Sequence, residues 1–173
     1  MLRSEQGAEP VGEPMMTVVS ESAAAYDVAG ELLGFGFTLV PRYAVTAQAG
    51  AGAVVEEEAI TDRLAFRTEW LRQNFTAAPA DLALLDIRGD SMEPTLADGD
   101  MVLIDRTRTG QASGIYVLNI SGELVAKRLI LQPGGTVEIR SDNPLYGVRV
   151  VADAALDQLV VVGRVVWHAR KMA

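Results

Sequence analysis

From residue 82 onwards, the sequence is a succession of short apolar runs separated by turn-forming residues. Each run is rich in Val, Ile and Leu and is too short for a typical helix, so we predict strands. The Gly, Pro, Asp and Asn residues between the runs supply the positive φ angles or backbone-bonding side chains that tight turns require. The predicted strands cover residues 82–87, 101–105, 115–120, 124–131, 136–140 and 159–167. This pattern predicts a mainly β fold with one or two short helices.

The first part of the chain differs in composition. Residues 1–36 are rich in Glu, Ala, Gly and Pro without a sustained apolar period, and we interpret them as a flexible acidic leader or linker. Residues 34–45 are β-prone, but Pro41 favours an extended or edge segment.

A short helix is predicted further on, where Thr68 is placed to cap it. That helix would hold three apolar side chains on one side, Trp70, Leu71 and Phe75.

Composition excludes several classes of function. With no cysteine among 173 residues, disulfides, thiolate nucleophiles and cysteine metal sites are excluded. No window approaches the roughly 18 apolar residues of a membrane span, so we expect a soluble, cytoplasmic protein without membrane contact. Residues 1–60 carry nine acidic residues against Arg3 and Arg42, while the rest is nearly balanced. This charge gives no footprint for phosphate backbones, and direct DNA binding by this chain is not expected.

Lysine is unusually scarce. Thirteen of the fifteen basic residues are arginine, and the only lysines are Lys127 and Lys171. An arginine cannot lose its proton in a protein, whereas a buried lysine can become a neutral base. Lys171 lies in a polar tail, while Lys127 lies within an apolar run. Lys127 is therefore a candidate general base.

The loop Gly89–Leu96 displays one serine, Ser91. A serine hydroxyl needs a base to become a nucleophile, and the only histidine, His168, lies near the chain end, which leaves Lys127. On a strand, Lys127 would share its face with apolar residues, and desolvation would lower its pKa from about 10.4. Arg128 has equally apolar neighbours, so alternation does not decide which face is buried.

The same loop also has plainer interpretations. Most isolated serines in such loops are turn residues. The nearby carboxylates could suggest a cation site, but they lack a glycine-spaced ligand pattern, and we interpret them as caps and turn formers. These are Asp90, Glu93, Asp98 and Asp100. No metal and no cofactor are predicted.

Four segments, in this order, resemble the successive motifs of the LexA-type self-cleaving peptidase domain: Gly89–Leu96, Gly99–Asp105, Val125–Leu129 and Ser141–Pro144. This domain is shared by LexA, phage repressors of the lambda type and UmuD-like proteins, and the resemblance covers about residues 37–173. It implies a LexA/signal-peptidase-like β fold of short twisted sheets. It also implies that Ser91 is the nucleophile and Lys127 the neutral base. The backbone amides of Asp90, Ser91 and Met92 would form the oxyanion hole.

The family cuts an Ala-Gly bond in its own chain, upstream of the serine. Ala49–Gly50 resembles that bond, and Ala51–Gly52 is the alternative. By composition alone the stretch reads as a flexible Ala/Gly connector. We therefore expect a cleavage-site segment at residues 37–60 and a peptidase and dimerisation domain at residues 61–173.

The resemblance also implies partners. In the family, a RecA filament promotes the cut during the DNA-damage (SOS) response, and a homodimer is expected. LexA and the phage repressors bind operator DNA through an N-terminal helix-turn-helix domain, for which residues 1–33 have neither room nor pattern. The chain is then either the C-terminal part of a repressor or a stand-alone UmuD-like protein. Leu39–Tyr43, which resembles the segment before the cleaved bond in phage-type repressors, favours the first.

Two further alternatives remain open. The serine and lysine motifs also resemble those of signal peptidases, but these are membrane-anchored, and Ser141–Pro144 favours the LexA type. The domain could also have lost cleavage and serve as a dimerisation or sensor domain. Residues 159–167 are apolar enough to be either core or interface.

Overall fold

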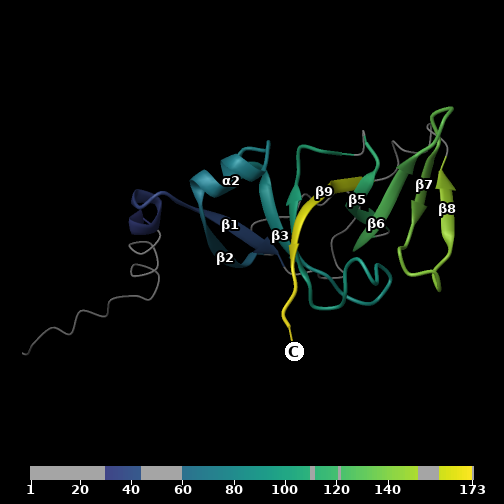
Figure 1. Cartoon of the computed structure of the whole chain (residues 1–173), viewed down its shortest axis with the longest axis horizontal. Coiled ribbons are helices and arrows are strands. Elements are labelled where there is room, and N and C mark those ends of the chain that lie inside the picture. Colours follow the sequence, from purple (N-terminus) through teal and green to yellow (C-terminus); the bar gives the residue numbers. More distant parts are fainter. Residues whose placement is uncertain (1–29, 44–59, 110–111, 121, 152–159, 173) are drawn as a thin grey trace, which may run out of the picture.

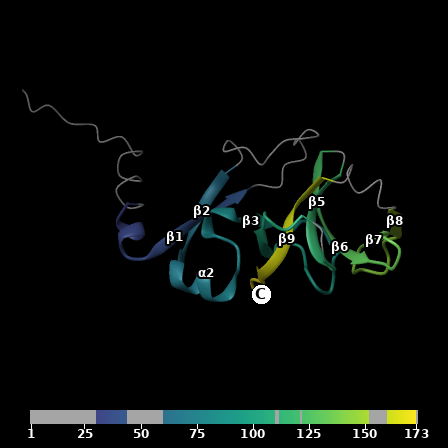
Figure 2. The same cartoon turned by 90° about the horizontal axis from the view of Figure 1, so that it is seen from above.

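A computed structural model describes residues 30–43, 60–109, 112–120, 122–151 and 160–172. Within these ranges nine strands form one sheet, in the order β2-β1-β3-β4-β9-β5-β6-β7-β8. Figures 1 and 2 show the strands following one another from β2 and β1 at one side to β7 and β8 at the other, with β9 between the two halves. The predicted mainly β fold is confirmed. The strands are β1 (Phe37–Tyr43), β2 (Ile60–Arg67), β3 (Leu82–Asp86), β4 (Met101–Asp105), β5 (Gly114–Ile120), β6 (Glu123–Leu131), β7 (Val137–Arg140), β8 (Val148–Val151) and β9 (Val160–Ala169).

The predicted strands beyond residue 82 all form, because turn residues end each apolar run where expected. The hairpin between β5 and β6 turns at Gly122, whose φ is 92° and whose N–H donates to Asn119 Oδ1. All neighbouring strands pair antiparallel except β1 and β3, which are parallel. Two strands, β2 and β8, were not predicted from the sequence.

The buried side chains form three clusters. The first, which we call the loop cluster, contains Tyr43, Leu85, Ile87, Met92, Leu96 and Val117 among others. The second lies around Leu71 and Leu84, and the third around Tyr116 and Leu129. The loop cluster matters most for function, because it joins β1, β3 and β5 to the loop that carries Ser91.

Of the two expectations for Pro41, an extended or an edge segment, the first is confirmed: Pro41 lies in strand β1, which is not an edge strand but lies between β2 and β3. Its pairing with β3 involves only Arg42 and Tyr43, the two residues after the proline. Pro41 itself therefore needs no N–H for that ladder, and a proline is tolerated in an interior strand.

The short helix, α2 (Thr68–Asn74), forms as predicted, with Trp70, Leu71 and Phe75 in or against the second cluster. The predicted cap is wrong: Arg67 occupies the N-cap position, and no side chain caps the helix. The hydroxyl of Thr68 is instead engaged with the hydroxyl of Thr38, at 2.8 Å. A 3-10 turn, η2 (Pro79–Asp81), leads into β3. In the part of the chain that the structure covers, no helix is long and apolar enough to cross a membrane.

Candidate active site

The loop that carries Ser91 is closed by backbone hydrogen bonds between the residues just after β3 and those just before β4. The Ile87 N–H donates to the Asp100 carbonyl over 2.7 Å, and the Gly99 N–H donates to the Ile87 carbonyl over 3.0 Å. Gly89 has a φ of 77°, and its N–H donates to Asp98 Oδ1 at 2.7 Å. A glycine is favoured there because a side chain would strain a left-handed backbone.

Two buried side chains anchor this loop from within. Met92 and Leu96 are each only 1% exposed and belong to the loop cluster. Ser91, which directly precedes Met92, remains half-buried. The burial of Met92 thus fixes the backbone next to Ser91, while the hydroxyl of Ser91 stays accessible.

Lys127 lies in the middle of β6 and reaches this serine. Its Nζ donates to Ser91 Oγ at 3.1 Å and to Ser141 Oγ at 2.8 Å. The ring of Tyr146 lies 5.8 Å from Nζ. The structure therefore brings together Ser91 and Lys127, the two residues that the sequence singled out, and adds a second serine.

Burial lowers the pKa of Lys127 from its ordinary value of 10.5. Desolvation has this effect because it disfavours the charged ammonium. In the described part of the chain, no carboxylate pairs with Lys127 to offset that cost. The neutral amine, which can accept a proton, is accordingly more populated near neutral pH than in a solvated lysine.

Arg128, the neighbour that the sequence could not distinguish from Lys127, has a different role. Its guanidinium donates from Nε and Nη2 to the two oxygens of Asp142, each at 2.6 Å. Thr95 also donates to Asp142, at 2.6 Å. Both faces of β6 are packed, since Leu124 and Ala126 contact the loop cluster whereas Val125 contacts the third cluster. This explains why alternation alone could not decide the orientation.

The segment after β7 forms the second side of the site. The Asn143 N–H donates to the Ser91 carbonyl, and its side-chain Nδ2 donates to the Asp90 carbonyl, both at 3.1 Å. The Tyr146 hydroxyl donates to Asp90 Oδ1. The serine loop is thus tied to the end of β7 as well as to β3 and β4.

The amides predicted to bind an oxyanion are available. The N–H groups of Asp90, Ser91 and Met92 donate no hydrogen bond to any described residue. Their carbonyls, in contrast, accept bonds from Glu93, Asn143 and Leu96 respectively. Amides oriented by a fixed loop and left without a partner are suited to stabilise a developing negative charge.

A small cleft of about 60 Å³ lies beside Ser91. Its walls are mostly apolar, and the charged side chains at its border come from the end of β3 and the residues after it. The lining residues are Leu85, Asp86, Ile87, Arg88, Ser91, Met92, Val117, Leu124, Val125 and Ala126. Such a cleft has room for a small side chain next to the serine hydroxyl.

Comparison with known proteins identifies the family. The family model described as Peptidase S24-like matches residues 41–166, which include Ser91, Lys127 and Ser141. The chain belongs to the Peptidase S24-like family. The resemblance to LexA-type domains that the motifs indicated is thereby confirmed.

Individual relatives of this S24-like chain include repressors. The 26 kDa repressor protein of Escherichia phage HK022 is 32% identical over 125 residues, which cover 70% of this chain and 53% of the phage protein. The LexA repressor of Thermotoga petrophila is 38% identical over 72 residues, 41% of this chain and 36% of the repressor. The protein ImpA of Salmonella typhimurium is 36% identical over 69 residues, 39% of this chain and 48% of ImpA. The chain spans about half the length, or less, of these curated relatives.

Two residues of the S24-like site were not singled out from the sequence. Ser141 and Asn143 occur in the motif Ser141–Pro144, which served only as part of the family resemblance. The signal that could have found Ser141 is strand register. Arg128 pairs with Arg140 in the antiparallel β6–β7 ladder, so the next positions along, Lys127 and Ser141, come opposite each other.

Three of the four carboxylates near Ser91, those of Asp90, Asp98 and Asp100, have structural partners in this S24-like domain. Asp98 accepts the Gly89 N–H, as expected of a turn former. Asp100 accepts the Ala97 N–H at 2.9 Å and also pairs with Arg170, whose Nη2 lies 2.7 Å from Oδ2. The side-chain hydrogen bond from Arg170 is the main cause that lowers the pKa of Asp100.

The predicted cleavage bonds, Ala49–Gly50 and Ala51–Gly52, lie outside the described residues. The residues that flank this segment, Tyr43 and Ile60, are described and both pack in or against the loop cluster. Both flanking residues therefore lie beside the core that supports the Ser91 loop.

Proposed function

We propose that this S24-like chain is a serine peptidase that cuts its own polypeptide between Ala49 and Gly50. Ser91 is the nucleophile and Lys127 the general base. The observation that carries the proposal is the 3.1 Å distance between Lys127 Nζ and Ser91 Oγ, combined with the lowered pKa of a half-buried lysine. A nucleophile and a base within hydrogen-bond reach are the minimum required for this chemistry.

In the first half of the reaction, the neutral amine of Lys127 takes the proton of the Ser91 hydroxyl as Oγ attacks the Ala49 carbonyl carbon. The amides of Asp90, Ser91 and Met92 donate to the resulting oxyanion. The C–N bond then breaks, and the ammonium of Lys127 returns a proton to the Gly50 nitrogen, which becomes a new amino terminus. Ala49 is left esterified to Ser91.

In the second half, Lys127 accepts a proton from a water molecule, which attacks the ester carbonyl. The ester bond breaks, Ser91 regains its proton, and Ala49 leaves as a free carboxylate. One water molecule is consumed for each peptide bond cut. Ser141, at 2.8 Å from Nζ, supports the orientation of the amine through both halves.

The cleft beside Ser91 supports a cut after an alanine. With a volume of about 60 Å³ and apolar walls, it suits the methyl group of an alanine better than a large side chain. Ala51–Gly52 meets the same requirement and stays the alternative bond.

We further propose that the chain acts within a regulator of the LexA or phage-repressor type. The names of the relatives, a phage repressor and a LexA repressor, support this setting. In this proposal the domain forms a homodimer, a RecA filament promotes its cut during the DNA-damage response, and operator DNA is bound by a separate helix-turn-helix domain.

The test is intact-mass and amino-terminal analysis of the purified chain after incubation near pH 9, with and without a RecA filament on single-stranded DNA. A new amino terminus at Gly50, absent in Ser91→Ala, is the expected result. The same product from Ser91→Ala would remove the nucleophile assignment. An uncut wild-type chain under both conditions would favour a dimerisation or sensor domain without peptidase activity.

A further inference from the structure

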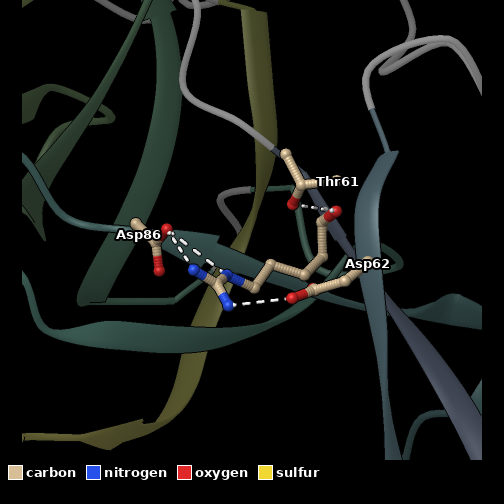
Figure 3. A network of polar contacts seen from close by, with 4 residues as sticks. Thr61, Asp62 and Asp86 are labelled. Atoms are coloured by element: carbon tan, nitrogen blue, oxygen red, sulfur yellow. Dashed lines mark hydrogen bonds and ion pairs between the residues drawn. The ribbon is translucent and has the colours of Figure 1, made fainter.

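Arg42, near the end of β1, makes a network of polar contacts that joins three strands (Figure 3). Its guanidinium donates to Asp86 Oδ2 from Nη2 at 2.9 Å and from Nε at 3.3 Å, and to Asp62 Oδ2 from Nη1 at 3.1 Å. Its backbone carbonyl accepts a hydrogen bond from the Thr61 hydroxyl at 3.1 Å. One side chain thus connects β1 to both of its neighbouring strands, β2 and β3.

Arg42 spans two joints within the sheet, the pairing of β1 with β2 and the pairing of β1 with β3. The two joints differ in strength. The ladder between β1 and β2 runs over seven residue pairs, from Phe37 with Arg67 to Tyr43 with Ile60. The ladder between β1 and β3 has only two pairs, Arg42 with Leu84 and Tyr43 with Leu85. The ion pair between Arg42 and Asp86 therefore reinforces the weaker joint, which attaches the β1–β2 pair to the rest of the sheet.

This joint lies between the two parts that self-cleavage must bring together. Residues 44–59, which contain the proposed bond, are joined to the described fold at Tyr43, the residue after Arg42, and at Ile60. On the other side, Asp86 borders the cleft beside Ser91 and ends the strand that leads into the serine loop. A shift of β1 relative to β3 would therefore move Tyr43 and Ile60 relative to Ser91.

We propose that Arg42 is a positioning residue for self-cleavage. Its ion pair with Asp86 fixes Tyr43 and Ile60, the described residues on either side of residues 44–59, relative to the serine loop. This inference rests on the proposed function. An intramolecular attack is fast only when the reacting atoms are held close together, and a displacement of about 1 Å can cost as much as 100-fold in rate. Arg42 acts through the position of the substrate segment and not through the chemistry at Ser91.

The experiment measures the rate of self-cleavage of the full chain near pH 9 in four single variants and one double variant. Arg42→Met removes the charge while keeping much of the side-chain length, and we expect a rate roughly tenfold lower than wild type. Asp62→Asn removes the partner at the stronger joint, and we expect a change of less than about twofold. Arg63→Met is the matched control, because Arg63 is exposed on β2 and makes no ion pair with a described residue.

The fourth variant, Asp86→Asn, tests whether the pair is the relevant unit. It should slow cleavage alone, but should add little to Arg42→Met in a double variant, since both changes break one interaction. Additive effects would mean that Asp86 acts only through the cleft, and would overturn the proposal. Equal slowing by Asp62→Asn would do so as well.

A second readout separates positioning from damage to the site. Labelling of Ser91 by a small fluorophosphonate reports nucleophile reactivity without the cleavage segment. Arg42→Met should be labelled at close to the wild-type rate while its self-cleavage falls. Loss of both would assign Arg42 a general structural role, and unchanged cleavage would overturn the proposal directly. A wild-type chain that is neither labelled nor cut would instead refute the proposed function itself, and this inference with it.

Discussion

The amine nitrogen of Lys127 lies closer to the hydroxyl oxygen of Ser141, at 2.8 Å, than to that of Ser91, at 3.1 Å. The proposed base is therefore held from two sides, by the loop after β3 and by the residue after β7. Because a lysine side chain has four rotatable bonds, two fixed acceptors restrict the amine much more than one would. Both hydroxyls and the burial of Lys127 bear on the predictions that follow.

Replacing Lys127 by methionine should abolish self-cleavage and stabilise the fold. We expect a rate at least about 1,000-fold lower than wild type, because the proposed base is lost. A lysine whose pKa is lowered on folding costs stability below that pKa, so Lys127→Met should have the larger free energy of unfolding at pH 7. Urea denaturation measures this difference, which should shrink as the pH approaches 10.5. Lys171→Met, at an exposed position, is the control and should change neither quantity.

The rate of self-cleavage should rise with pH and then level off. The neutral amine is the reactive form, and burial lowers the pKa of Lys127, so the plateau should begin below the ordinary value of 10.5. Initial rates measured from pH 6 to pH 11 give the midpoint. A rate that stays flat across this range would exclude lysine as the base.

Replacing Ser141 by alanine should slow self-cleavage without abolishing it. The variant keeps Ser91 and Lys127 but removes the acceptor at 2.8 Å, and we expect a loss of roughly tenfold. That acceptor stabilises the charged amine, so the midpoint of the pH profile should move to lower pH. Ser141→Thr, which retains the hydroxyl, should recover most of the rate. A shift in the midpoint is the decisive readout, because a purely structural defect would leave it in place.

Replacing Asp142 by asparagine should destabilise the fold at neutral pH by about 2 kcal/mol, since its carboxylate accepts hydrogen bonds from a charged guanidinium. The pKa of Asp142 is lowered, mainly by its side-chain hydrogen bond with Arg128. This stabilisation is therefore present above the ordinary pKa of 3.8 and is lost as the pH falls through the lower value in the fold. Urea denaturation should show a difference between variant and wild type that narrows below pH 4. Glu138→Gln, whose pair with Arg140 spans 3.7 Å, is the control and should cost less than about 0.5 kcal/mol.

Strands β3 to β7 were predictable because a glycine, proline or aspartate lies at, or within two residues of, the end of each apolar run. Strand β2 escaped prediction because Asp62, Arg63 and Arg67 give Ile60–Arg67 a polar character, with five of its eight residues exposed. Only its pairing with β1 makes it a strand. Strand β8 is a four-residue strand at the end of the sheet, where pairing with β7 alone defines it.

The site was predictable to the extent that chemistry could be inferred by elimination. Lysine scarcity and a single peripheral histidine pointed to Lys127 before its neighbours were known. Ser141 and Arg42 could not be found in this way, since a serine after a strand and an arginine within one are common residues. Their significance comes from strand register and from parallel pairing, which depend on contacts between residues far apart in the sequence.

The position of β1 between β2 and β3 has a consequence for what a cut would release. A break at Ala49–Gly50 would place β1 on the upstream piece, while β2 and β3 remain on the downstream piece. The nicked protein would still be held together by the backbone ladders on both sides of β1. Separation of the two pieces would require β1 to break its hydrogen bonds with both β2 and β3. Cleavage of the peptide bond and release of the upstream piece would therefore be two events with separate rates.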